Sequence, residues 1–253
     1  MFPDGQPPMP KSYRRIFLKR SEVALSRLMP ADAEWLETWV NDPTTTRWMA
    51  TGRVQSTLDQ VVAQIMHWQE PRDWPFAVLI SDQKEIDGQY QAIGTVGLYD
   101  ADLLTRKAEF RILLGAPHTG KGYGTEATRL VLDFGFQRLG LHRIWLGVTD
   151  ANIPAVKCYE KCGFTREGLL RDDLFRDGHF YDSIRMSILD TEWRTQWRTG
   201  EARPAGISVR GPSIQAPAAG LWTCSWPTAV ASQDIAVTPP SPSDPGREAG
   251  PTS

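Results

Sequence analysis

The sequence predicts a mixed α/β fold in which helices flank a mostly antiparallel central sheet. Strand-like and helix-like segments alternate between residues 21 and 198. Two neighbouring apolar runs, 92–99 and 108–114, are separated by a short polar link, which predicts an antiparallel hairpin. Beyond them, helical patterns separate the strand patterns, as in βαβ crossings. The sheet is therefore expected to be mixed and not purely parallel.

The first half of this region alternates between short strands and helices. Asp32 is the expected N-cap of a first helix, and Ser56 or Thr57 of a second, because short polar side chains favour that position. Asn41-Asp42-Pro43 should end the first helix, since proline cannot continue it. The strand patterns cover residues 23–28, 76–80, 92–99 and 108–114.

The second half begins with a glycine-rich segment, 115–124, and a helical pattern that runs to about Leu139 and ends at Gly140. A strand pattern and a short helix closed by Gly163 follow. Two final strands should flank a turn at residues 176–178. The predicted strand is 144–149, the predicted helix 152–162, and the last strand about 181–189.

Composition divides the chain into three parts. Residues 1–20 are interpreted as a flexible basic leader, because they lack the charged and then apolar layout of a secretory signal. Residues 21–198 form the predicted folded domain. Residues 199–253 contain nearly half of the 19 prolines, so we expect a Pro-rich, disordered tail.

Composition also excludes several classes of function. A formal net charge of −2 argues against a general nucleic-acid binder, which usually carries a basic surplus. No apolar stretch is long enough to span a membrane. Three cysteines are too few for a disulfide scaffold and favour a reducing, cytoplasmic location. Neither nucleic acid nor membrane is therefore expected as a partner.

The glycine-rich segment is the main functional signal. A strand pattern runs into residues 115–124, and these open a helix. Such a loop exposes backbone N–H groups beside the positive end of the helix dipole, and glycines let a phosphate approach the backbone closely. The sequence therefore predicts an anion site, and most readily a phosphate site.

Two familiar phosphate loops fit this segment poorly. Gly115 to Lys121 matches the start of a nucleotide-triphosphatase loop, but Gly122 replaces the hydroxyl residue that would hold Mg²⁺. Gly122 to Ala127 fits the dinucleotide-binding pattern, with Asp150 as a possible ribose ligand. That fold needs a parallel first strand, however, and about 107 residues precede this one.

Together with a downstream motif, the loop resembles the GNAT superfamily of acetyl-CoA-dependent N-acetyltransferases. The resemblance covers roughly residues 22–195 and extends to the branch with ribosomal-protein and spermidine acetyltransferases. Its residues are the loop Thr119–Gly124, then Asn152, Ala155, Tyr159 and Gly163-Phe164. The branch is indicated by Ala108-Glu109-Phe110, Gly120–Ala127, Glu167-Gly168, Gly178, Asp182 and Met186.

The resemblance implies direct transfer of an acetyl group from acetyl-CoA to a primary amine in a ternary complex, with no metal. It implies that the backbone of one strand pairs with the pantetheine arm, that the loop holds the pyrophosphate and that Asn152 touches the arm. Thr119 departs from the family's Arg or Gln. The implied acetyl-CoA residues are Ile112, Leu113, Leu114, Thr119, Gly120, Lys121, Gly122, Tyr123, Gly124, Thr125 and Asn152.

Two residues are candidates for proton transfer. The resemblance places Tyr159 at the family's general acid, and a phenol with an ordinary pKa near 10 can protonate a thiolate at neutral pH. Many relatives have a glutamate where this chain has Gly147, so the candidate base or water-positioning group is Glu109. A salt bridge from Glu109 to Arg106 or Arg111 is the structural alternative.

The acceptor stays open between a protein N-terminus, a polyamine, and an amino sugar or aminoglycoside. Acids near the last hairpin favour a cationic acceptor, and a homodimer is possible. His118 is expected to face solvent, and Cys158 and Cys162 are interpreted as structural. The alternative to an enzyme is a noncatalytic GNAT-fold module that binds acyl-CoA as a sensor, which the missing acid at Gly147 favours.

Overall fold

A computed structural model describes residues 15–49, 52, 54–81 and 90–198 of the protein. Eight strands form one sheet in the order β1-β2-β3-β4-β5-β6-β8-β7. The strands are β1 (Ile16–Arg20), β2 (Val23–Arg27), β3 (Trp74–Ser81), β4 (Tyr90–Asp102), β5 (Lys107–Leu114), β6 (Arg143–Thr149), β7 (Thr165–Arg176) and β8 (His179–Leu189).

Neighbouring strands in this sheet are antiparallel with one exception, the pair β5 and β6. β4 and β5 form the hairpin predicted from the two apolar runs, with Tyr99 opposite Glu109. The crossing from β5 to β6 through a helix makes their pairing parallel. The predicted fold class, a mixed and mostly antiparallel sheet flanked by helices, is confirmed.

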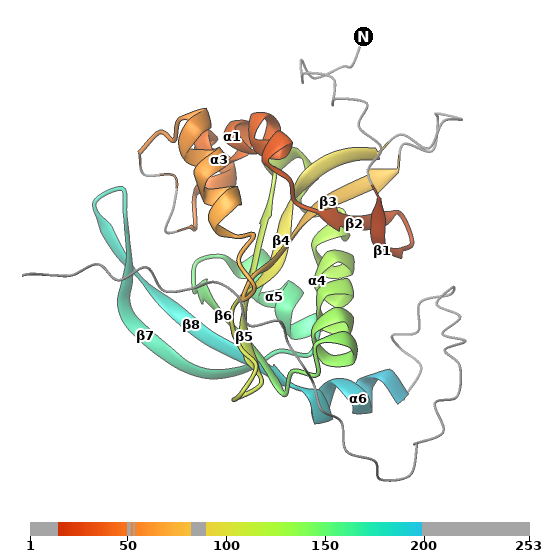
Figure 1. The fold of residues 1–253 in the computed structure, drawn as a ribbon. Coiled ribbons are helices and arrows are strands. Elements are labelled where there is room, and N and C mark those ends of the chain that lie inside the picture. The colour runs from red at the N-terminus through yellow and green to blue at the C-terminus, as the bar shows by residue number, and fades with distance from the viewer. Residues whose placement is uncertain (1–14, 50–51, 53, 82–89, 199–253) are drawn as a thin grey trace, which may run out of the picture. The chain divides into compact units, whose positions relative to one another are not determined.

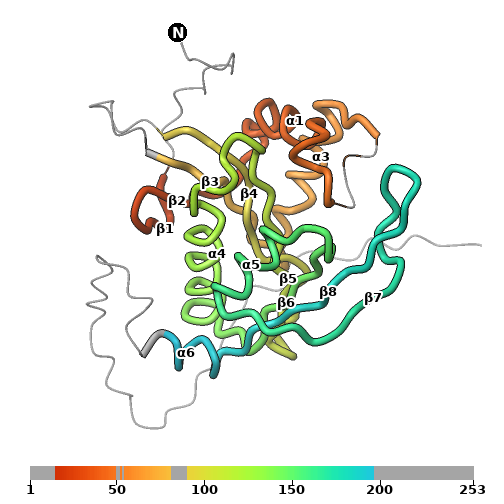
Figure 2. Tube along the Cα trace, turned by 180° about the vertical axis from the view of Figure 1, so that it is seen from behind, coloured from red at the N-terminus to blue at the C-terminus, as the bar shows by residue number. Residues whose placement is uncertain are grey.

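Helices cover both faces of the sheet (Figures 1 and 2). One core joins the sheet to α4 and α5, and a second core joins the opposite face to α1 and α3. The α-helices are α1 (Ala33–Asn41), α2 (Pro43–Thr46), α3 (Leu58–His67), α4 (Tyr123–Asp133), α5 (Ile153–Lys161) and α6 (Asp190–Arg198). Shorter turns are η1 (Pro30–Asp32), η2 (Ala116–His118) and the π-helical η3 (Phe134–Arg138).

Alternation along the strands supplies the two cores. In β3, Phe76 and Val78 belong to the α4 side, whereas Ala77 and Leu79 belong to the α1 and α3 side. Successive side chains of a strand point to opposite faces, so a continuous apolar run can serve two layers at once. A strand with both faces covered therefore needs no polar residue at alternate positions.

Local capping explains where the first helices begin. Thr57 accepts a hydrogen bond from the Gln60 amide, and the Gln60 side chain accepts one from the Thr57 amide, which makes a capping box for α3. Asp32 is the N-cap residue of α1, as predicted, but its side chain makes no capping hydrogen bond. Its carboxylate instead accepts hydrogen bonds from the Met29 amide and Trp35 Nε1.

Three elements differ from the sequence-based expectation. The expected leader, 1–20, overlaps β1, because Ile16–Arg20 pairs with β2 and extends the sheet. Asp42 caps the short α2 through the amides of Thr44 and Thr45, where only a helix stop was expected. The last helix, α6, follows β8 without a turn. Residues 1–14 and the predicted tail, 199–253, lie outside the described residues.

The last hairpin is long, with 12 residues in β7 and 11 in β8. β7 and β8 run side by side to a turn at Asp177-Gly178, and their far ends project from the sheet in both views (Figures 1 and 2).

Within the described ranges, no helix is long and apolar enough to cross a membrane.

A carboxylate is buried where α4, β1 and α6 meet. Asp133 accepts a hydrogen bond from Trp193 Nε1 at 3.2 Å, while its Oδ2 is buried with no hydrogen-bond partner among the described residues. Burial raises the pKa of Asp133 from 3.8 to about 7, although Arg20, Arg129 and Trp193 oppose the shift. The folded state therefore holds a proton here that the unfolded chain releases at lower pH.

We predict that Asp133→Asn changes the pH dependence of stability. Since the folded pKa is raised, Asp133 costs stability as pH rises from about 4 to 7, on the order of 2–4 kcal/mol. Urea unfolding at pH 5 and pH 8 should therefore show a larger gain for Asp133→Asn at pH 8. An equal effect at both pH values would mean that another group titrates.

Candidate functional site

The parallel strands β5 and β6 are paired only over their first residues and then separate. Its ladder joins residues 107–109 to residues 143–145 and ends at Glu109 and Trp145. Both strands continue, β5 to Leu114 and β6 to Thr149. The edge of β5 that faces β6 therefore carries backbone groups with no strand partner beyond Glu109, although β4 still pairs with the other edge. Such an edge can bind an extended ligand.

The glycine loop follows the free part of β5. η2 and residues 119–122 connect β5 to α4, whose N-cap is Gly122 with a φ of 88°. No side chain caps α4, so its first N–H groups stay available to a ligand. Gly120 also has a positive φ, 72°, and no atom lies within 4 Å of where a Cβ would stand at either glycine. The backbone is thus open to close approach.

A shallow groove of about 320 Å³ adjoins this helix end. Lys121 and Lys161 line it, and both are cations suited to a phosphate. Glu126 also lines the groove, but its carboxylate is paired with Arg20 at 2.7 Å and with Arg129 at 3.3 Å. The other lining residues are Ser21, Glu22, Val23, Gly122, Tyr123 and Thr125.

The other predicted acetyl-CoA residues contribute mainly through their backbone. The side chains of Ile112 and Leu114 pack into the α4-side core, and that of Leu113 into the opposite core. The Thr119 hydroxyl donates to the Ala116 carbonyl at 2.8 Å, within the loop itself. Asn152 is the N-cap of α5, and its Oδ1 accepts from the Ala155 amide at 3.4 Å. Its predicted contact with the pantetheine arm stays a prediction.

Tyr159 lies on the face of α5 that packs against the sheet. Its ring makes edge contacts with Phe110 at 6.0 Å and Phe164 at 5.9 Å between ring centroids. Burial raises the pKa of Tyr159, and the neighbouring Cys158 and Cys162 add to the shift. The phenol is therefore protonated at neutral pH and can donate a proton, but it is a weaker acid than an exposed tyrosine.

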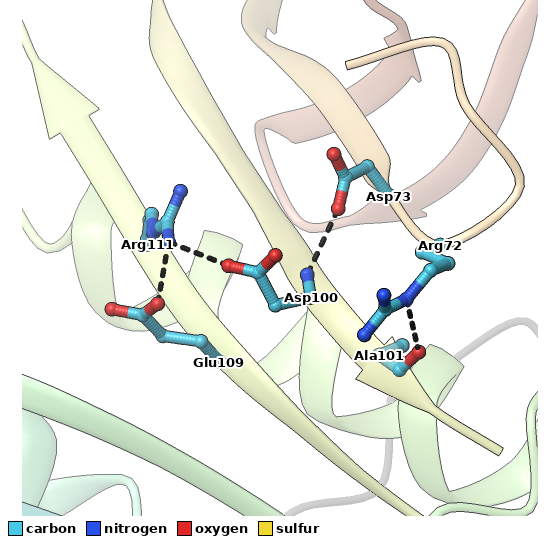
Figure 3. Close-up of polar contacts among 6 residues, drawn as sticks. All are labelled: Arg72, Asp73, Asp100, Ala101, Glu109 and Arg111. Carbon is cyan, nitrogen blue, oxygen red and sulfur yellow. Dashed lines mark hydrogen bonds and ion pairs between the residues drawn. The ribbon is translucent and has the colours of Figure 1, made fainter. Parts of the chain in front are cut away.

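Glu109 lies where the two strands part and is 20% exposed. Arg111 Nη2 donates to Glu109 Oε2 at 2.5 Å and to Asp100 Oδ2 at 3.0 Å, so one guanidinium joins two carboxylates (Figure 3). The ring of Tyr99 packs 4.9 Å below that guanidinium. The salt bridge from Glu109 to Arg111, expected as the structural alternative, is therefore formed. The role of Glu109 as a base stays a proposal.

Loop residues hold the second carboxylate of this pair in place. Asp73 Oδ1 accepts from the Asp100 amide at 2.9 Å, and Arg72 Nε donates to the Ala101 carbonyl at 3.3 Å (Figure 3). Asp100 has a φ of 50°, in the left-handed region. Its side chain is 66% exposed and is directed toward Arg111.

Gly147 lies on β6, two residues beyond the end of its ladder with β5, and faces open space. No atom lies within 4 Å of where its Cβ would stand. Arg185 lies opposite Gly147 on β8 and stacks 4.1 Å above the ring of Trp145. The position at which many relatives have a glutamate therefore has room for one, and a cation lies on the neighbouring strand.

Sequence reasoning missed or misplaced three residues. Arg111 was expected only as a possible salt-bridge partner of Glu109. Its second ion pair, with Asp100 on the neighbouring strand β4, was not expected. His118 was expected to face solvent but is 8% exposed and packs on the ring of Trp39 at 5.8 Å. Cys158 borders the first turn of α4, with its Sγ 3.3 Å from Thr125 Oγ1. In each case the partner is distant in sequence, so no local pattern could indicate it.

Comparisons with known proteins assign the chain to a family. A family model described as the acetyltransferase (GNAT) domain matches residues 22–165. The chain therefore belongs to the GNAT acetyltransferases, as its motifs predicted.

Spermidine acetyltransferases are among the similar proteins. The spermidine N(1)-acetyltransferase of Vibrio cholerae is 39% identical over 107 residues, which cover 42% of this chain and 62% of that enzyme. A crystal structure of spermidine N-acetyltransferase from Vibrio cholerae with CoA and spermine superposes with a TM-score of 0.62 at 28% identity, over 68% of this chain and 98% of that one. A dodecameric structure of the same enzyme matches with a TM-score of 0.57 at 29% identity, over 68% of this chain and 96% of that one.

No cluster of three or more His, Cys, Asp or Glu side chains is arranged to hold a metal ion in the part of the chain that the structure describes. His142 instead pairs with Asp190 at 2.7 Å.

We predict that two glycines of the loop respond differently to substitution by alanine. Gly122→Ala has space for the methyl group but must keep a φ of 88°, which costs about 1–2 kcal/mol. Gly124→Ala brings its Cβ to 3.4 Å from Leu114 Cδ1, an ordinary contact, so it should be nearly neutral. Thermal unfolding and binding of acetyl-CoA by calorimetry measure both. Equal losses in the two variants would contradict the strained-turn account of Gly122.

Proposed function

We propose that this chain is an acetyl-CoA-dependent N-acetyltransferase that moves the acetyl group directly to a primary amine of a polyamine. One observation supports it most: β5 and β6 part beside Glu109, between an uncapped glycine loop at the end of β5 and Tyr159 on α5. The similar enzymes named for spermidine support the acceptor class. Acetyl-CoA would supply the acetyl thioester.

The glycine loop and the free edge of β5 fit such a donor. The amides at the start of α4 would hold the pyrophosphate, with Lys121 and Lys161 nearby to balance its charge. The backbone of residues 112–114 would pair with the amide-containing arm, as an added strand does. The pairing of Glu126 with Arg20 and Arg129 keeps its carboxylate from repelling the phosphates.

The acceptor amine must lose a proton before it attacks. A lysine-like amine, with a pKa near 10.4, is about 3.4 units from neutrality at pH 7, a cost of about 4.6 kcal/mol. Glu109 lies where the strands part and can receive that proton directly or through a water. An α-amine would need less help, because its pKa is near 7.7–8.0. A base at this place is therefore most useful for a polyamine.

The charges around Glu109 favour a cationic acceptor. Two carboxylates, Glu109 and Asp100, share the single cation Arg111, so the cluster keeps a net negative charge. A second ammonium group of a polyamine can pair with the exposed oxygen atoms of Asp100. An amino sugar with a single amine has no second ammonium group to pair with Asp100.

Transfer of the acetyl group leaves a thiolate that needs a proton. Tyr159 is protonated at neutral pH and lies on the helix that follows the parted strand β6. Its raised pKa makes the transfer less favourable than from an ordinary phenol, so its contribution should lie at the low end for a general acid. The phenolate then recovers a proton from water.

A thiol-release assay with acetyl-CoA and a panel of amines tests this function. Turnover with spermidine or spermine and little with aminoglycosides, amino sugars or short peptides is the expected result. Turnover only with peptide N-termini would replace the polyamine as acceptor. Binding of acetyl-CoA without turnover would favour the noncatalytic sensor instead.

Self-association and location complete the proposal. The expected homodimer stays a prediction, and the dodecameric relative supports a multimer of this chain. Light scattering of the purified protein measures its mass directly. The cytoplasmic location also stays a prediction.

We predict that Tyr159→Phe lowers kcat about 100-fold, because the leaving thiolate loses its proton donor. The affinity for acetyl-CoA should stay within about twofold, since the phenyl ring keeps the contacts with Phe110 and Phe164. Steady-state kinetics and calorimetry measure the two quantities. Parallel loss of turnover and binding would assign Tyr159 a structural role.

We predict that Glu109→Gln lowers kcat/KM for spermidine about 10-fold to 100-fold at pH 7, the range for losing a charged hydrogen-bond partner. The loss should shrink at pH 9, where more of the amine is neutral in solution. Glu160→Gln is the matched control, because Glu160 is an exposed carboxylate that likewise pairs with an arginine, Arg166. A loss that is the same at both pH values would remove the base role.

A further inference from the structure

Two cysteines of α5 face the first turn of α4. Cys158 Sγ lies 3.3 Å from Thr125 Oγ1, and Cys162 Sγ lies 3.7 Å from the Thr125 carbonyl oxygen. The two thiols are also close enough to shift each other's pKa. Cys162 is 4% exposed, whereas Cys158 is only partly buried. Of this pair, Cys158 is the one that a solute can reach.

The surroundings of Cys158 stabilise its thiolate. The Cys162 thiol and the Thr125 hydroxyl can donate to its sulfur, and Lys161 and Arg129 add positive potential. The Cys162 thiol has the largest of these effects, and together they outweigh burial and lower the pKa of Cys158 from 9.0 to about 6. The same contact raises the pKa of Cys162, which therefore stays a thiol.

The position of Cys158 matters because of what lies next to it. Its sulfur is 3.9 Å from where a Cβ on Gly124 would stand. Thr125, its hydrogen-bond partner, lines the groove together with Lys121 and Lys161. A group attached to the sulfur therefore begins beside the first turn of α4. That turn carries the amides that the proposed function assigns to the pyrophosphate.

We propose that Cys158 is a modification site for low-molecular-weight disulfides, and that the mixed disulfide blocks the phosphate end of the acetyl-CoA site. The second half of this proposal rests on the proposed function, and the first half does not. The probe is glutathione disulfide, whose carboxylates can pair with Lys121 and Lys161, although Glu22 and Glu126 line the same groove.

The chemistry is thiol–disulfide exchange. The Cys158 thiolate attacks one sulfur of the small disulfide, a new S–S bond forms and the original S–S bond breaks. The released thiolate takes a proton from water. Cys158 is oxidised to the mixed disulfide, one half of the small disulfide is reduced, and an excess of a free thiol reverses the exchange.

The pH dependence of the rate distinguishes Cys158 from an ordinary thiol. At pH 6, about half of a thiol of pKa 6 is ionised, against about 0.3% for an ordinary pKa of 8.5. The lower basicity costs roughly 13-fold in nucleophilicity. The net advantage is about 10-fold at pH 6, and it disappears by pH 8, where the ordinary thiol is also partly ionised.

The experiment treats the full chain with glutathione disulfide at pH 6 and pH 8. Peptide mass spectrometry follows Cys158, Cys162 and Cys224 separately, and an unfolded peptide covering residues 155–161 serves as the reference thiol. Acetyl-CoA binding is measured by calorimetry before treatment, after treatment and after reduction with dithiothreitol. Cys158→Ala and Cys162→Ala are carried through the same steps.

The expected result has four parts. Cys158 reacts about 10-fold faster than the peptide at pH 6 and no faster at pH 8, and saturating acetyl-CoA slows it at least 10-fold. The modified chain loses acetyl-CoA binding at least 10-fold, and reduction restores it. Cys158→Ala binds acetyl-CoA normally and is insensitive to the disulfide. Cys162→Ala loses the advantage at pH 6, because the main hydrogen-bond donor to the thiolate is gone.

Two results would overturn the proposal. One is a rate for Cys158 at pH 6 no greater than that of the peptide. The other is a modified chain that binds acetyl-CoA as tightly as the untreated one. If the untreated chain does not bind acetyl-CoA, the proposed function is wrong, and so is the proposal that the mixed disulfide blocks acetyl-CoA binding. The rate of Cys158 relative to the reference peptide at pH 6 still decides whether Cys158 is a modification site.

Discussion

The early end of the ladder between β5 and β6 is the constraint on which the rest of the site depends. Three residue pairs hold these strands together, and the ladder stops at Glu109 and Trp145. Neither strand is lost from the sheet, because β4 continues to pair with β5 and β8 with β6. The parting therefore leaves backbone groups of β5 available to a ligand without leaving a strand unsupported. The glycine loop and α5 come directly after the two parted ends.

The ionisable groups of the site are held by partners inside the domain. Glu109 is bound by Arg111, and Glu126 lies between Arg20 and Arg129. The sulfur of Cys158 is bound by a second thiol and a hydroxyl. A charge that is partly removed from water needs such a partner to stay ionised. These contacts fix where each of these side chains lies in the site.

Local sequence patterns were sufficient for most of the fold. The helix start at Thr57, the hairpin of β4 and β5 and the glycine loop before α4 all depend on residues close together in the chain. Propensity, capping and turn chemistry act over that range, so the sequence predicts them. The N-terminal strand was missed, since Ile16–Arg20 is a strand only because it pairs with β2.

By itself the sequence determined the order of the central elements, the phosphate-type loop and the family, because each is written in neighbouring residues. Only the tertiary structure decided where β5 and β6 part, that His118 is buried on Trp39, and that Arg111 joins Glu109 to Asp100. Each of these contacts joins residues from different strands or helices. Their distances depend on how the whole sheet twists and packs, and no local pattern of residues encodes that.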